Sequence, residues 1–520
     1  MTVTGSTYNV TPTLNAISPA AVESGSSDTT ITVTGTGFVS GSTVQLGTTA
    51  LTTSFTNSAT LTATVPAAQL ASLGWQPVAV SNPTPGGGTS NPLPLTVFQV
   101  LTLGANHILY EPFSRMIYAS VSSDATSVTG NTIAPITPDK GSVGTPVFIG
   151  SQPTKIAISD DGNVLYSLLG GANSVALFNL QTQTTEFTFS PPLNNYGSSM
   201  TGFRDIAVQP GSENTIVVDP GAYSGMAIID VNPTAKTAAI RGTNSGGISG
   251  TSLQFFDPNT LFLIGDTWGT LEELPITASG FSGYSTTYTS SDLLDFSAFK
   301  LSGKFAFAET GGVADVTTTP ATQIGYYAPL VQSNAAHQVA PDTSLGQVFF
   351  LANTSIANES YYNGPDGIVV YNQRTFVPNA TLPMSLGTIE GNTTYSGVDL
   401  IRWGQDGLAA LTSSGNIYLL RGPFVVPQLL NANSAASLTV SSATSITRGA
   451  GNTLLTLTGS NFVPGVAVWW NGSYRTTTIV DATHITVAIP ASDLTSVGSG
   501  SLVATNPGAP ASNALTVAIN

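Results

Sequence analysis

Seven polar residues precede apolar segments at fairly regular intervals in the middle of this sequence. If those segments are the innermost strands of a ring-shaped fold, the polar side chains form a ring around its axis. Such a ring can hold a cation, a sugar or another small polar ligand. It can also simply line a solvated channel, where polar groups avoid being buried without partners. The seven residues are His107, Lys155, Asp205, Ser252, Asp295, Gln338 and Asp399.

The composition limits which metals such a ring can bind. The chain has three histidines and no cysteine, so disulfides and thiolate metal sites are excluded. Three of the seven ring residues are aspartates, whose oxygen ligands suit Ca²⁺ better than a transition metal. We therefore expect no cofactor, with Ca²⁺ as the one candidate ion. Asp160-Asp-Gly-Asn163 lacks the later carboxylates of an EF-hand, which favours a hairpin turn.

The sequence gives little support for hydrolytic catalysis. It contains no G-x-S-x-G motif, no H-E-x-x-H motif and no cysteine nucleophile. The three imidazoles are His107, His337 and His484, of which His337 could approach His107 across the ring. We predict no catalytic residue. The alternative is a lactonase-like or lyase-like enzyme, which would combine such a histidine with carboxylates and a metal.

Trp469 and Trp470 are neighbours in a predicted strand, so their side chains point to opposite faces. We expect Trp470 to fill a core and Trp469 to lie at the surface. There Trp469 could contact a sugar or another chain, or it could pack against the middle of the protein.

Composition favours strands and excludes several partners. Charged residues make up 8% of the 520 residues, and Thr and Val are abundant. The net charge of −15, without a Lys/Arg cluster, argues against nucleic acid. No apolar run reaches membrane-spanning length, and Met1 is not followed by a signal-peptide pattern. We expect an extracellular or cell-surface protein whose signal peptide is absent from this sequence.

Residues 98–427 repeat about seven times, which predicts a β-propeller of four short strands per unit. The apolar strand starts are Ile108, Ile156, Ile206, Leu253, Phe296, Val339 and Leu400. The last unit ends after its third strand, and residues 98–103 are expected to supply the fourth and close the ring. The segment from Ile156 to Leu180 resembles the YVTN/lactonase-like propeller repeat, whose enzymatic members imply the catalytic alternative.

The two ends of the chain are copies of each other. Gly35, Phe38, Gly41, Val44 and Pro66 recur as Gly459, Phe462, Gly465, Val468 and Pro490. This pattern, set among short alternating strands, resembles the IPT/TIG family of immunoglobulin-like domains, which implies a β-sandwich at residues 13–97 and another at 428–520. The predicted fold is therefore all-β: a seven-bladed β-propeller flanked by two IPT/TIG β-sandwich domains.

Residues 1–12 have strand composition and precede the first sandwich. They could form a tail, or they could pair with a sheet edge of a neighbouring copy. We therefore expect a non-catalytic structural or adhesion protein, which assembles with itself into a filament or surface layer by strand addition. The expected partners are other copies or cell-surface proteins, with carbohydrate as a further candidate. A propeller enzyme and a carbohydrate-binding protein are the alternatives.

Overall fold

The computed structural model describes residues 8–191, 202–220, 225–243, 250–265, 270–282, 285–286, 298–327, 338–352, 367–384, 399–425, 435–506 and 509–520. These residues form strands throughout, joined by turns and by short 3-10 segments at Ala67–Leu70, Pro138–Lys140 and Ala491–Leu494. The fold is all-β, as the sequence predicts. Within the described ranges, no helix has the length and apolar character needed to cross a bilayer.

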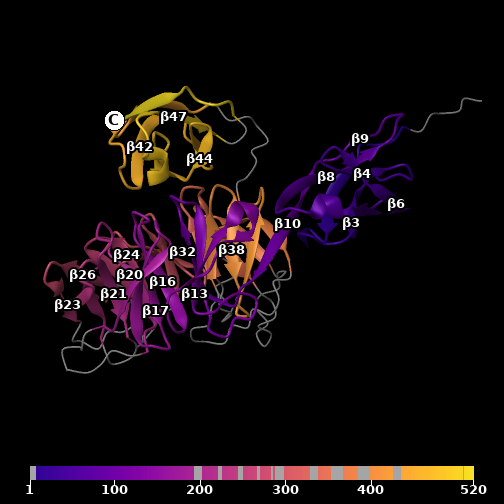
Figure 1. Cartoon of the computed structure of the whole chain (residues 1–520). Helices are drawn as coiled ribbons and strands as arrows, with labels where there is room; N and C mark the ends of the chain where they lie inside the picture. Colours follow the sequence, from indigo (N-terminus) through magenta and orange to yellow (C-terminus); the bar gives the residue numbers. More distant parts are fainter. Residues whose placement is uncertain are drawn as a thin grey trace, which may run out of the picture.

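The N-terminal module is a sandwich of two sheets (Figure 1). One sheet has the order β1-β3-β7-β6, and the other contains β10-β8-β4-β5, with β2 and β9 beside it. The strands are β1 (Thr13–Ser18), β2 (Ala21–Glu23), β3 (Thr29–Thr36), β4 (Thr43–Leu46), β5 (Thr49–Ala50), β6 (Thr52–Asn57), β7 (Thr60–Val65), β8 (Gly74–Asn82), β9 (Gly88–Thr89) and β10 (Leu93–Thr102).

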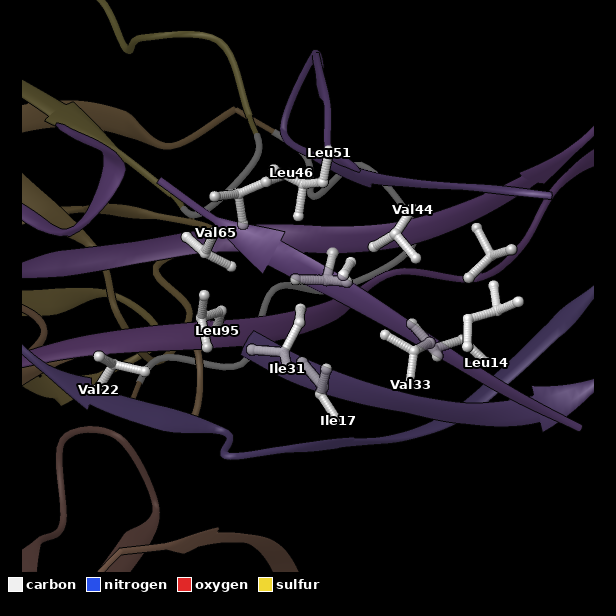
Figure 2. Close-up of a cluster of buried hydrophobic side chains, with 14 of the residues drawn as sticks. Leu14, Ile17, Val22, Ile31, Val33, Val44, Leu46, Leu51, Val65 and Leu95 are labelled. Atoms are coloured by element: carbon white, nitrogen blue, oxygen red, sulfur yellow. The ribbon is translucent and has the colours of Figure 1, made fainter. Parts of the chain in front are cut away.

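Alternation of side chains builds the core of this module. In β7, Leu61, Ala63 and Val65 are buried, whereas the intervening threonines face outward. Figure 2 shows Leu14, Ile31, Val33, Leu46 and Leu95 pointing toward one another between the strands. Phe38, which follows the G-x-x-F pattern, belongs to the same buried cluster.

Seven small antiparallel sheets follow one another between Ala105 and Arg421 and form the blades of a propeller. Each innermost strand contacts the innermost strand of the next blade, and β37 of the last blade contacts β11 of the first, so the ring is closed. The first three blades are β11 (Ala105–Glu111), β12 (Met116–Val121), β13 (Thr132–Thr137), β14 (Ser142–Val143) and β15 (Val147–Phe148); β16 (Pro153–Ile158), β17 (Val164–Leu169), β18 (Ser174–Asn179) and β19 (Thr184–Phe189); and β20 (Asp205–Val208), β21 (Thr215–Asp219), β22 (Ala227–Asn232) and β23 (Thr237–Thr243).

The remaining four blades complete the ring. They are β24 (Gly250–Asp257), β25 (Thr260–Gly265), β26 (Leu271–Thr277), β27 (Gly280–Phe281) and β28 (Ser285–Thr286); β29 (Phe299–Ser302), β30 (Phe305–Ala308), β31 (Gly312–Asp315) and β32 (Thr322–Tyr326); β33 (Gln338–Asp342), β34 (Gln347–Ala352), β35 (Gly367–Asn372) and β36 (Pro378–Pro383); and β37 (Asp399–Trp403), β38 (Gly407–Leu411) and β39 (Asn416–Arg421).

The innermost strand of the fifth blade starts later than the spacing predicted. The sequence placed its start at Phe296, which lies outside the described residues, whereas β29 begins at Phe299. Phe299 is buried like the first apolar residues of the other innermost strands. Both phenylalanines follow polar or small residues, so the pattern alone could not choose between them.

β10 belongs to two domains at once. Residues Leu93–Val97 pair with β8 of the N-terminal sandwich, and Gln99–Thr102 pair with β39 of the last blade. Because the last blade has only three strands of its own, β10 supplies the fourth. In Figure 1, β10 runs from the indigo module into the blade that contains β38.

The C-terminal module repeats the sandwich and lies over one face of the propeller (Figure 1). Its sheets have the orders β40-β42-β46-β45 and β41-β48-β47-β43-β44. The strands are β40 (Ser437–Ser441), β41 (Ser445–Ile446), β42 (Thr453–Ser460), β43 (Ala467–Trp470), β44 (Ser473–Arg475), β45 (Thr477–Asp481), β46 (His484–Ile489), β47 (Gly498–Thr505) and β48 (Leu515–Ile519).

The segment before the first sandwich is partly bound to its own module. The backbone N–H of Asn9 donates to the Pro85 carbonyl, and the Gly87 N–H donates to the Asn9 carbonyl. The Asn82 side-chain amide donates to the carbonyl of Val10. Residues 1–7 lie outside the described ranges, so pairing with another copy stays a prediction that concerns those residues.

Candidate axial binding site

The described ring residues lie at the start of the innermost strands. Asp205, Gln338 and Asp399 are the first residues of β20, β33 and β37. His107 precedes the buried Ile108 in β11. Lys155 and Ser252 lie where the pairing register of β16 and β24 shifts. Asp295 lies outside the described residues.

Two ring residues connect successive blades through their side chains. Nδ1 of His107 accepts the backbone N–H of Ile156 in the next blade at 3.4 Å. Oδ2 of Asp205 accepts the backbone N–H of Leu253, again in the next blade, at 2.8 Å. These polar side chains therefore satisfy backbone groups at the axis and hold neighbouring blades in register.

Lys300 completes the axial cluster, although the sequence did not single it out. Its Nζ lies 2.5 Å from Oδ1 of Asp399 and donates to the Leu400 carbonyl at 2.8 Å. Since Lys300 belongs to β29 and Asp399 to β37, this ion pair joins the fifth and seventh blades.

The histidine of the cluster is neutral at ordinary pH. Burial, assisted by the positive charges of Lys155 and Lys300 and opposed by Asp399, lowers the pKa of His107 to about 3. Because its Nδ1 accepts a hydrogen bond, the proton of the neutral ring is on Nε2. The 3.7 Å approach of Nε2 to Oδ2 of Asp399 is therefore not an ion pair at neutral pH.

The pKa values of the two aspartates of the cluster are shifted in opposite directions. Burial raises the pKa of Asp205, against the effects of Lys155 and of backbone N–H groups. Burial also acts to raise the pKa of Asp399, but the ammonium groups of Lys300 and Lys155 outweigh it and hold that pKa below its usual value. The carboxylate form is therefore favoured more at Asp399 than at Asp205.

The cluster does not have the donor set of a cation site. Within the described residues, no group of three or more His, Asp or Glu side chains is arranged to hold a metal ion. Lys155 and Lys300 add positive charge beside the aspartates, which disfavours a divalent cation. Ca²⁺ binding stays a prediction that would have to involve residues outside the described part.

Trp469, the predicted surface contact, has its described side-chain contacts within its own module, and its role in binding a partner stays a prediction. Its side chain is half-buried, its Nε1–H donates to Oγ1 of Thr505 at 2.9 Å, and its ring meets Tyr474 edge-to-face at 6.1 Å. Tyr474 in turn lies under the Arg115 guanidinium of the propeller, 4.7 Å from the ring centroid. Trp470 is buried in the sandwich core, as predicted.

The turn at Asp160–Asn163 is a structural element of the second blade. Oδ1 of Asp161 accepts the backbone N–H of Asn163 at 3.1 Å, and Gly162 has a φ of +67°. The Asp161 carbonyl accepts a hydrogen bond from the Asn452 amide of the C-terminal module at 2.9 Å. This is the hairpin turn that the sequence favoured over a calcium loop.

Comparison with solved structures returns many matches at low identity, among them a domain described as a β-propeller. The Cps50 (Swd1) β-propeller domain from Myceliophteria thermophila is 12% identical, covers 61% of this chain and 95% of its own, and has a TM-score of 0.42. Kuenenia stuttgartiensis hydrazine synthase is 14% identical, with 62% and 97% covered and a TM-score of 0.43. An auxiliary nutrient binding protein from Bacteroides thetaiotaomicron is 11% identical, with 79% and 97% covered and a TM-score of 0.37.

No curated protein matches this sequence. The family described as IPT/TIG domain matches residues 12–97 and 438–519. These ranges coincide with the two sandwiches, whose repeated Gly-x-x-Phe-x-x-Gly pattern places Phe38 and Phe462 in their cores. The chain therefore carries one IPT/TIG domain at each end of its propeller.

Proposed function

We propose that this protein is a non-catalytic extracellular or cell-surface protein with a structural or adhesive role. The observation that carries the proposal is that β10 is a strand of both the N-terminal sandwich and the last propeller blade. With this shared strand, the sandwich is a fixed arm of the propeller and not a domain on a flexible linker. A rigid arm suits a load-bearing or presenting role.

The chemistry of the axis supports a non-catalytic role. A general acid or base works best when its pKa lies near the working pH, whereas the pKa of His107 is lowered to about 3 by burial and by nearby lysines. Asp205 is engaged by backbone N–H groups, and Asp399 by Lys300. These groups stabilise the ring of blades and are not poised for proton transfer.

The N-terminal module also supports assembly by strand addition. β6 is a terminal strand of its sheet and pairs with β7 on one side only in the described part of the chain. Its residues Thr52–Asn57 include no charge and no proline, the devices that usually protect an edge, and Phe55 is exposed. Such an edge is open to a strand from another copy.

Sedimentation and electron microscopy of the purified chain at increasing concentration test assembly. The proposal predicts filaments or sheets, which the edge variant Ser54→Lys should suppress. Ser496→Lys is the matched control, because it adds the same charge at an exposed position of the other sandwich. A chain that stays monomeric at high concentration contradicts the assembly part. Immunogold labelling of intact source cells tests location, and label confined to the cell interior contradicts it.

A further inference from the structure

Lys155 is a cation at the propeller axis that has no direct charge partner among the described residues. Its Nζ makes no hydrogen bond or ion pair with any described residue, whereas Lys300 is bound to Asp399 and to the Leu400 carbonyl. Lys155 nevertheless lies close enough to His107, Asp205 and Asp399 to influence their pKa values. An ammonium group inside a half-buried polar cluster is an attachment point for an anion.

Two further groups at the axis have unused hydrogen-bonding capacity. His107 presents an Nε2–H donor, and the 3.7 Å to Oδ2 of Asp399 is too long for a hydrogen bond. Asp399 uses Oδ1 for Lys300 and for the Leu400 backbone N–H. Its Oδ2 accepts no hydrogen bond from the described residues and lies 3.7 Å from His107 Nε2, so the cluster contains one unused acceptor as well as the unused donors of His107 and Lys155.

We propose that this axial cluster binds a small hydroxylated carboxylate. The carboxylate of the ligand accepts hydrogen bonds from Lys155 Nζ and His107 Nε2–H, and a hydroxyl of the ligand donates to Oδ2 of Asp399. A neutral sugar would leave the Lys155 charge unpaired. A bare anion would leave the Asp399 oxygen unpaired and would meet its negative charge. Both parts of the ligand are therefore required.

The cluster lies at the end of the innermost strands opposite to the one that the C-terminal module contacts. The ring residues stand at the start of the innermost strands, whereas the C-terminal module contacts the turns at their other end. The contacted residues are Pro112 after β11, Asp161 after β16 and Gln405 after β37. Side chains in the cluster keep some exposure, 12% for His107 and 28% for Lys300.

Calorimetric titration with D-glucuronate, D-glucose and acetate tests the proposal on the full chain. D-glucuronate carries both a carboxylate and hydroxyls, and each of the other probes carries one of the two. We expect D-glucuronate to bind at least about tenfold more tightly than either, a difference of ~1.4 kcal/mol. Lys155→Met should weaken binding by about tenfold or more, and Lys155→Arg should retain most of it because the positive charge is kept.

Lys140→Met is the matched control, because it removes the same charge from an exposed 3-10 turn on the first blade. It should bind as the unaltered chain does. The proposal is overturned if D-glucuronate does not bind, if either partial probe binds equally well, or if Lys155→Met binds normally. It is also overturned if Lys155→Met and Lys155→Arg lose binding alike while retaining the native circular dichroism spectrum. Assembly is not needed for this binding, so the two proposals can fail separately.

Discussion

The two IPT/TIG domains share one fold but are attached to the propeller in opposite ways. Several of their internal hydrogen bonds correspond between the copies, with both partners 424 residues apart. Oδ1 of Asp28 accepts the Ala67 N–H and Oδ1 of Asn452 accepts the Ala491 N–H, both at 2.9 Å. The duplicated sequence therefore specifies the sandwich itself, and the attachment of the C-terminal copy adds residues that differ between the copies, Tyr474 and Asn452, to shared ones such as Thr476.

The N-terminal domain is joined through the backbone. The pairing of Gln99–Thr102 with β39 makes one continuous sheet out of sandwich strands and blade strands. Phe98 and Val100 also pack against the hydrophobic cluster of the last two blades, and Leu73 packs where the last and first blades meet. Such an attachment requires only strand-forming residues at the right place.

The C-terminal domain is joined through side chains on its surface. Oγ1 of Thr476 donates to the Pro112 carbonyl at 2.7 Å, and the Gln405 amide donates to the Gly465 carbonyl at 3.1 Å. Tyr474 stacks under Arg115 of the first blade. At the position that matches Tyr474 the N-terminal domain has Ala50, so it lacks the aromatic anchor, although Thr52 matches Thr476. One fold thus presents different surfaces for different attachments.

Shortening a buried side chain of the shared strand β10 should have the largest effect on stability. Leu101 is buried at the closure of the ring and pairs with Ile417, so Leu101→Ala should lower the free energy of unfolding by about 2–5 kcal/mol. Chemical denaturation followed by fluorescence measures this change. Leu454→Ala is the control, since Leu454 is 62% exposed and its loss should change stability little. Equal effects of both substitutions would contradict a load-bearing role for β10.

Removing the aromatic anchor should release the C-terminal domain without unfolding it. Tyr474→Ala takes away the contacts with Arg115 and Trp469, which we expect to weaken docking by about 2 kcal/mol. Small-angle X-ray scattering should report a larger radius of gyration, while the thermal transition of the propeller is kept. Val497→Ala, at a position 67% exposed in the same domain, should leave the scattering curve unchanged. An unchanged curve for Tyr474→Ala would mean that docking does not depend on this ring.

Acidification should lower the folding stability of the propeller, to which both IPT/TIG domains are attached. The pKa of His107 is about 3 in the folded chain, against 6.5 for an ordinary histidine. Between these values the unfolded chain binds a proton that the folded chain does not, so folding stability falls as the pH is lowered through this window. The His107 contribution changes by at most about 1.4 kcal/mol per pH unit. Urea unfolding at several pH values should show a weaker pH dependence in His107→Gln, and parallel curves would refute the buried neutral histidine.

The smallest effect is expected when Asn452 of the C-terminal domain is replaced by aspartate, the residue at the matching position 28 of the N-terminal domain. Asn452→Asp keeps the acceptor for the Ala491 N–H but loses the donor to the Asp161 carbonyl. Docking should weaken by about 1 kcal/mol, with the sandwich intact. Small-angle X-ray scattering of the double variant Asn452→Asp/Tyr474→Ala checks whether the two effects on docking add. Asp28→Asn is the reciprocal control and should change neither domain.

Strand positions were predictable because apolar and polar residues alternate along each strand, and this alternation is visible in the sequence. The predicted strand starts Ile108, Ile156 and Ile206 lie in β11, β16 and β20. Each domain buries its apolar face within about 90 residues, so local alternation was sufficient. The start of the fifth blade could not be fixed in this way, since Phe296 and Phe299 give the same pattern.

The axial cluster was predictable only in part. His107, Lys155, Asp205 and Asp399 could be found because each precedes an apolar strand start. Lys300 could not be, because it follows the buried Phe299 and reaches Asp399 from two blades away. The contact of Tyr474 with Arg115 could not be predicted either, since it depends on where the C-terminal domain lies and not on local sequence.

Hydrogen–deuterium exchange compares the two attachments most directly. Our account predicts that the amides of Gln99–Thr102 exchange only when the propeller unfolds globally, because they belong to its last blade. The segment Ser473–Arg475 should exchange faster, through undocking of the C-terminal domain, and Tyr474→Ala should accelerate it further. Exchange of Gln99–Thr102 as fast as that of exposed turns, under conditions where the other blades remain protected, would contradict the shared strand.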